Sequence, residues 1–163
     1  MQQMNWPVTA LAALIPMLIG MVWYSKALFG TTWMRINRFR EEDMKGANMI
    51  VIFGLTLFFS FILAIVVNSI VIHQFTLASI VGGDPKPGPD RDWVEATMRT
   101  YGHNFRTFKH GALHGGIASI FFGLPVLGIP ALFERRGWKY ILIHLGYWFV
   151  TLALMGGVIC QWT

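Results

Sequence analysis

The stretch MIVIFGLTLFFSFILAIVVNSIVI (residues 49–72) decides the fold, because it contains no Asp, Glu, Lys or Arg. The hydrocarbon core of a bilayer is about 30 Å thick, and an α-helix crosses it with about 20 apolar residues. This stretch is long enough to do so, and we therefore predict that it forms a transmembrane helix.

Three other stretches also lack these four residue types: 7–25, 111–133 and 140–163. They explain why only 13% of the chain is charged, when soluble domains contain about 25% charged residues. We predict an all-α, polytopic integral membrane protein with four transmembrane helices, near 5–25, 49–72, 111–133 and 139–161. The length fits a single domain over 1–163.

The positive charges indicate an orientation. Eight of the 13 Lys and Arg residues lie between the first and second spans or between the third and fourth, and five lie in the loop 73–110. The positive-inside rule therefore predicts that both termini lie on the outer side of the membrane. The net charge of +5 fits contact with anionic lipid headgroups, and we do not expect a nucleic-acid partner.

Tryptophans are expected to anchor the helix ends in the headgroup layer, where an indole ring is partly apolar and still donates a hydrogen bond. The candidates for these interfacial anchors are Trp6, Trp23, Trp33, Trp138 and Trp162.

The connections between the spans contain two further signals. The acidic run Glu41–Asp43 predicts that the second helix starts nearby, because carboxylates stabilise a helix N-terminus. In the outer loop 73–110, a Gly- and Pro-rich linker precedes an apolar stripe of Val94, Met98, Tyr101, Phe105 and Phe108. This spacing predicts an amphipathic helix near 91–109 that lies on the membrane surface or caps the bundle; a lid over a polar cavity is the alternative.

Small residues spaced four apart predict close contacts between helices, since membrane helices associate through tight packing. The predicted packing residues are Gly111, Gly115, Ser119 and Gly123 in the third span, Ser60 and Ala64 in the second, and Ala153 and Gly157 in the fourth. These faces are expected to meet within the bundle or in a second copy of the chain.

Histidines supply the candidate polar site. In HGALHGG (residues 110–116), His110 and His114 lie one helical turn apart and share a face. Such nitrogen ligands suit zinc or copper, and the remaining ligands of a three- or four-ligand site would have to come from His73 or His103. Asn68 lies one turn inside and could join the same polar cluster. The alternative is that these histidines only hydrogen-bond water and backbone. His144 is expected to face the bundle interior and hydrogen-bond a neighbour.

The sequence offers no catalytic constellation, because the four spans contain no carboxylate and the chain contains neither HExxH nor CxxC. We therefore expect a non-enzymatic membrane protein, an accessory or structural subunit that packs against other membrane helices or another copy. One alternative is a small-solute transporter or channel with a path lined by Asn68, His110, His114 and His144. A second is a metal or cofactor binder at the outer histidines. Bound lipid is expected, and the sequence assigns no cofactor.

Two segments carry a family resemblance. GMVWYSKALFGTTWM (residues 20–34) followed by EEDMKGANM (residues 41–49), and ALFERRGWKYILIHLGYWFVTLALMGGVI (residues 131–159), resemble the domain of unknown function 1761 family. The resemblance implies a small four-helix protein of a bacterial cytoplasmic (inner) membrane. It implies no activity and no catalytic residues, and members tend to carry an amide where His144 stands.

Overall fold

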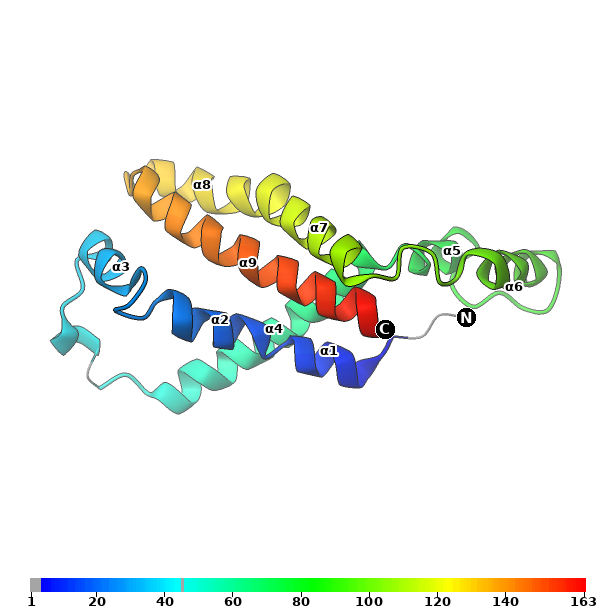
Figure 1. Ribbon diagram of the computed structural model, residues 1–163, viewed down its shortest axis with the longest axis horizontal. Helices are drawn as coiled ribbons and strands as arrows, with labels where there is room; N and C mark the ends of the chain where they lie inside the picture. The colour runs from blue at the N-terminus through cyan, green and yellow to red at the C-terminus, as the bar shows by residue number, and fades with distance from the viewer. Residues whose placement is uncertain (1–3, 45) are drawn as a thin grey trace.

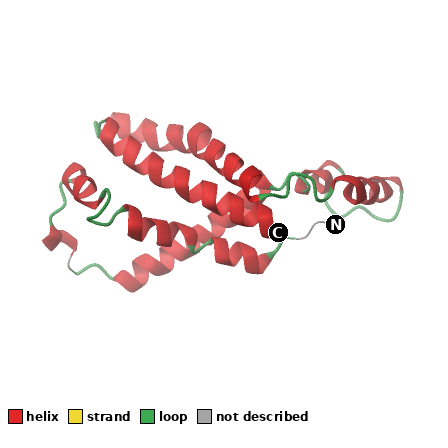
Figure 2. Ribbon diagram, viewed as in Figure 1, coloured by secondary structure: helices red, strands yellow, loops and turns green. Residues whose placement is uncertain are grey.

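The computed structural model describes residues 4–44 and 46–163, and the regular structure within them is entirely helical (Figure 2). Residues 1–3 of the predicted domain 1–163, and Lys45 among the counted basic residues, lie outside the described part. The helices form an elongated bundle in which the start of the first helix, at Trp6, and the end of the last, at Trp162, lie toward the same side (Figure 1).

Four segments are long and apolar enough to cross a membrane, which confirms the predicted number of spans. The first comprises α1 (Trp6–Ala12) and α2 (Ile15–Trp23), and the second is α4 (Met49–Val71). The third comprises α7 (Phe108–Ala118), the π-helical turn η2 (Ser119–Gly123) and α8 (Leu124–Phe133), and the fourth is α9 (Trp138–Trp162). The shorter elements are α3 (Gly30–Asn37), the 3₁₀-helix η1 (Glu41–Met44), α5 (Phe75–Ile80) and α6 (Pro89–Tyr101).

Large apolar side chains cover the outside of the bundle. Ile50 is 86% exposed and Phe133 is 87% exposed, and many other aliphatic and aromatic side chains on the four spans are also exposed. A contiguous apolar surface of this kind would drive association in water, whereas lipid tails solvate it. The chain is a multi-pass membrane protein.

The first span is interrupted rather than continuous over 5–25 as predicted. α1 ends at Ala12 and α2 begins at Ile15, with Pro16 in the first turn of α2. Proline has no N–H to donate to a preceding carbonyl, and its ring crowds the turn before it. The backbone N–H of Leu14 instead donates to the Leu11 carbonyl at 3.1 Å, which tightens the turn at the break.

The third span contains a π-helical turn that ends the predicted small-residue stripe. Gly111, Gly115 and Ser119 are buried, but Gly123 is not, and a β-carbon there would have Ser119 and Ala118 of its own segment as nearest neighbours. A π-helical turn adds one residue and so rotates the following face. Beyond η2 the buried small residues are Gly128 and Ala131, so the buried stripe inside the bundle does not continue through Gly123.

α7 packs on α9 more extensively than on any other element. A β-carbon at Gly111 would collide with the carbonyl oxygen of Gly156, and one at Gly115 would collide with that of Leu152. Gly157 lies beneath the Phe108 ring. The remaining small residues predicted to pack are also in the interior or at its edge: Ser60 and Ala64 are buried, and the backbone of Ala153 lies beside Gly115.

The connections differ from the predicted ones at three places. The second span begins at Met49, after a separate 3₁₀ turn at the acidic run, rather than near Glu41. The amphipathic helix α6 covers Pro89–Tyr101 and stops short of residue 109. The short helices α3 and α5 were not predicted, because each lies beside a longer apolar run that dominates the pattern.

The tryptophans predicted as anchors fall into two groups. Trp6, Trp138 and Trp162 are 55%, 69% and 59% exposed, as interfacial rings should be. Trp23 instead packs into the bundle, where its Nε1 donates to the Ile143 carbonyl at 3.1 Å. Trp33 lies against the ring of Tyr24, with centroids 5.5 Å apart.

The two ends of the bundle differ in their polar residues. We call the end where α4 ends and α7 begins, which holds His73 and His110, the histidine end. The helices α5 and α6 project from it (Figure 1). The opposite end, formed by α3 and the turn between α8 and α9, contains Arg38 and Arg135, and we call it the arginine end.

Candidate metal-binding site

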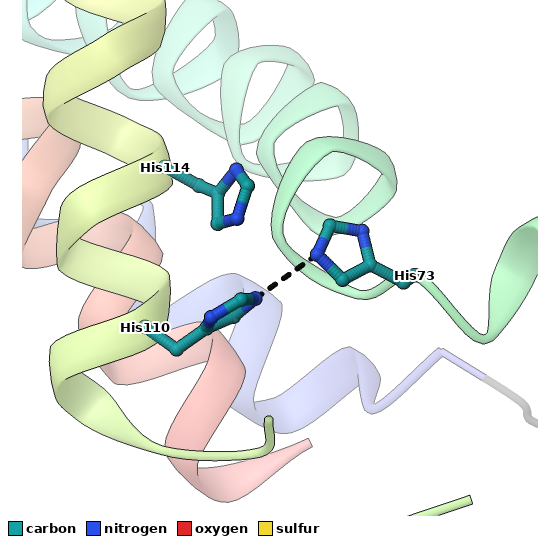
Figure 3. A group of neighbouring side chains, drawn as sticks. All are labelled: His73, His110 and His114. Carbon is teal, nitrogen blue, oxygen red and sulfur yellow. Dashed lines mark hydrogen bonds between the residues drawn. The ribbon is translucent and has the colours of Figure 1, made fainter. Parts of the chain in front are cut away.

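Three of the five histidines meet at the histidine end (Figure 3). His110 and His114 extend from α7 toward His73, which follows the C-terminus of α4. Each offers one ring nitrogen, and these three nitrogens all lie within 4.8 Å of one another. The Nε2 atoms of His73 and His110 are 3.0 Å apart and share a hydrogen bond.

The two faces of α7 explain why its histidines point toward α4. Gly111 and Gly115 sit against the backbone of α9, where no side chain fits. Successive residues on an α-helix are rotated by about 100°, so His110 and His114 are turned away from that contact. The glycine face therefore fixes the rotation of α7, and this rotation directs both imidazoles toward His73.

The start of α7 is also held in place by side chains. Thr107 caps the helix, with its Oγ1 accepting from the His110 backbone N–H at 3.2 Å. The backbone N–H of Phe108 donates to Oε1 of Gln161 in α9 at 2.9 Å. These bonds use N–H groups that a helix N-terminus leaves without partners, and they keep His110 in a defined position.

His73 is positioned by its neighbours in the chain. Ile72 is fully buried at the end of α4, and the side chain of Gln74 donates to the carbonyls of Tyr101 and Asn104 at 3.2 and 3.0 Å. The chain thus leaves α4 with its direction fixed on both sides of His73. His73 itself is exposed, whereas His110 and His114 are half-buried.

Phe105 also belongs to this site, although the sequence predicted it only as part of the amphipathic stripe. Its ring stacks on the His110 ring, with centroids 5.2 Å apart and an interplanar angle of 27°. Its φ of 62° lies in the left-handed region, which phenylalanine rarely adopts. Its carbonyl accepts from the Thr107 N–H at 2.9 Å and from Sγ of Cys160 at 3.3 Å. A strained backbone held in this way is typical of functional sites.

The donor set suits a transition-metal ion. Zinc binds imidazole nitrogen at about 2.0–2.1 Å, which places two nitrogens of a tetrahedral site roughly 3.4 Å apart. The three histidine nitrogens lie within 4.8 Å of one another, so small side-chain movements would bring them to this spacing, and the present His73–His110 hydrogen bond would be replaced by bonds to the metal. Three protein ligands leave a fourth position for water or another ligand. His73 and Phe105 also line a neighbouring cavity of about 330 Å³.

The other predicted polar residues lie elsewhere. Asn68 is fully buried, and its Nδ2 donates to Oγ1 of Thr9 at 3.1 Å and to the Ala64 carbonyl at 2.8 Å. His103 is exposed and does not join the three-histidine group. Neither residue contributes a ligand atom to the cluster.

His144 lies toward the arginine end, inside the bundle as predicted. Its Nδ1 shares a hydrogen bond of 2.9 Å with the hydroxyl of Tyr24, and its ring packs against that of Tyr140. Burial raises the pKa of the Tyr24 hydroxyl, and the neighbouring hydroxyls of Tyr147 and Tyr140 add to this effect. Tyr24 therefore stays neutral and keeps its hydrogen bond over the physiological range.

Comparison with known proteins supports one assignment. No curated protein and no solved structure matches the chain. The model of one family, described as "Protein of unknown function (DUF1761)", matches residues 7–160, which is nearly the whole chain. Together with the four membrane-competent helices, this match places the chain in the DUF1761 family.

Proposed function

We propose that the protein binds a transition-metal ion, zinc in the first place, at the membrane surface through His73, His110 and His114. One observation carries the proposal: three imidazoles from two separate helices present their nitrogens within 4.8 Å of one another. Histidines that served only to contact water would have no reason to converge from positions so distant in the chain. Copper is the nearest alternative ion, because imidazole suits both metals.

The expected cellular placement belongs to the same proposal. We expect a multi-pass protein of a bacterial cytoplasmic membrane. The excess of Lys and Arg around the arginine end supports an orientation with that end inside and both termini outside. The metal site would then face the periplasm. Its open side and exposed His73 suit an ion that is received from, or passed to, another molecule.

The two other hypotheses, an accessory subunit that packs against other helices and a small-solute transporter or channel, have less support. The glycine face of α7 is occupied by α9 of the same chain, so it supports packing within the bundle rather than against a partner subunit. Asn68 is bonded to Thr9, and His144 lies with Tyr24 toward the opposite end. We therefore place metal binding ahead of a role as an accessory subunit or a channel.

Zinc titration of the purified, metal-stripped protein in detergent tests the proposal, using competition with a chromophoric chelator. We expect one Zn²⁺ per chain. Changing even an outer-shell partner of a metal site costs about 10–100-fold in affinity, so His110→Ala and His114→Ala should each lose at least that much.

His103→Ala is the matched control, because His103 lies in the same loop region but outside the cluster. It should bind zinc as the original protein does. Absence of stoichiometric zinc or copper binding, or an equal loss in His103→Ala and His114→Ala, would refute the proposal.

A further inference from the structure

A polar cavity lies at the opposite end of the bundle from the histidines. Its volume is about 620 Å³, and it is lined by Ile36, Arg38, Glu134, Arg135 and Arg136. These residues come from two places distant in the sequence, the end of α3 and the turn between α8 and α9. Figure 1 shows both at the arginine end. The fold thus gathers three guanidinium groups around one hollow.

Both helices that supply these arginines end in the same way. Arg38 follows α3 with a φ of 58°, and Arg135 follows α8 with a φ of 56°. In each case the next residue donates its N–H to a carbonyl five positions earlier: Phe39 to Met34, and Arg136 to Ala131, both at 2.9 Å. This is the Schellman motif, whose left-handed position is usually glycine. An arginine stands at each position and lines the cavity.

The cavity carries an excess of positive charge. Glu134 is its one carboxylate, and it pairs with Nε of Arg136 at 2.9 Å. The guanidinium of Arg136 also lies over the Tyr140 ring, 5.6 Å from its centroid, which holds the side chain in place. Within the described part of the chain, neither Arg38 nor Arg135 is within salt-bridge distance of a carboxylate.

We propose that this cavity binds a phosphate group, which Arg38 and Arg135 contact directly and the fixed Arg136 helps to neutralise. Guanidinium groups match the oxygens of a phosphate in paired, charge-assisted hydrogen bonds, which makes arginine the preferred residue for this anion. The exposed Trp138 and Phe133 border the same turn, and tryptophan marks the depth of lipid headgroups. The phosphate can belong to a phospholipid headgroup or to a small soluble molecule.

The test compares two variants with the same loss of charge. The first, Arg38→Gly with Arg135→Gly, removes both cavity arginines and places glycine where the backbone favours it, so the fold is retained. The second, Arg35→Gln with Lys139→Gln, removes two positive charges from the same end, but neither residue lines the cavity. Each is incorporated into nanodiscs containing phosphatidylglycerol, and retained lipid is measured by native mass spectrometry. In parallel, inorganic pyrophosphate is titrated into the detergent-purified proteins by calorimetry.

We expect the original protein and the Arg35→Gln/Lys139→Gln variant to retain phosphatidylglycerol, or to bind pyrophosphate, at least tenfold better than the Arg38→Gly/Arg135→Gly variant. A difference in the nanodiscs alone identifies a lipid headgroup, and a difference in the pyrophosphate arm identifies a soluble phosphate. Equal behaviour of the two variants in both arms would overturn the proposal, as would the absence of binding in both. Zinc binding plays no part in either readout.

Discussion

Gly111 and Gly156 face each other where α7 crosses α9, with their backbones in direct contact. A β-carbon on Gly111 would collide with the Gly156 carbonyl oxygen, and one on Gly156 would collide with that of Gly111. This reciprocal contact sets the rotation of α7. Because His110 adjoins Gly111 in the sequence, the contact also sets the direction of the first imidazole in the histidine cluster.

The first prediction concerns this contact. Gly111→Ala forces two backbones apart, and overpacking of a well-packed site typically costs about 1–3 kcal/mol. We expect a lower midpoint of thermal unfolding in detergent, and a weaker zinc affinity because His110 moves with the helix. Gly54→Ala is the control, since a β-carbon at Gly54 meets nothing within 4 Å. Alanine there should raise stability by about 0.5–1 kcal/mol. Equal stability of the two variants would contradict the close approach.

The four spans were predictable because a helix that crosses lipid needs about 20 apolar residues without charge. Such a stretch can be recognised in one sequence without any relatives. The register beyond Ser119 was not predictable, because the π-helical turn at Ser119–Gly123 adds one residue to the helical repeat and has no signature in the residue spacing. Spacing alone extended the stripe to Gly123, whereas the structure buries Gly128.

The candidate site was partly predictable. The spacing of His110 and His114 follows from the helical repeat, but the choice between His73 and His103 as third ligand depends on how the chain turns after α4. The roles of Phe105 and of the paired arginines depend on left-handed backbone positions. Sequence patterns do not mark such positions when the residue is not glycine.

The second prediction is that zinc stabilises the folded protein. A ligand that binds only the native state adds about 2.7 kcal/mol when its concentration is 100 times its dissociation constant. Zinc should therefore raise the unfolding midpoint of the original protein and of His103→Ala. It should leave that of the His110→Ala/His114→Ala double variant unchanged. A rise of the same size in the double variant would show that the ion binds elsewhere.

The third prediction separates Asn68 from the metal site. Asn68 is fully buried and links α4 to α1 through its bond to Thr9. Hydrogen bonds between membrane helices contribute about 0.6 kcal/mol on average, so Asn68→Ala should lower stability modestly and leave zinc affinity unchanged. Ser69→Ala, at the neighbouring exposed position, is the control and should change neither. A loss of zinc affinity in Asn68→Ala would place Asn68 in the site after all.

The last prediction is a pH dependence at the opposite end. Burial raises the pKa of Tyr24 in the folded protein, whereas an unfolded tyrosine titrates near about 10. Raising the pH above that value ionises the unfolded chain first, so the stability from neutral Tyr24 is present below pH 10 and is lost progressively above it. Tyr24→Phe should be less stable at neutral pH, because the bond to His144 is gone. It should also lose stability less steeply above pH 10. Unfolding midpoints measured in detergent across this range check both effects, and parallel curves for the two proteins would exclude a buried, neutral Tyr24.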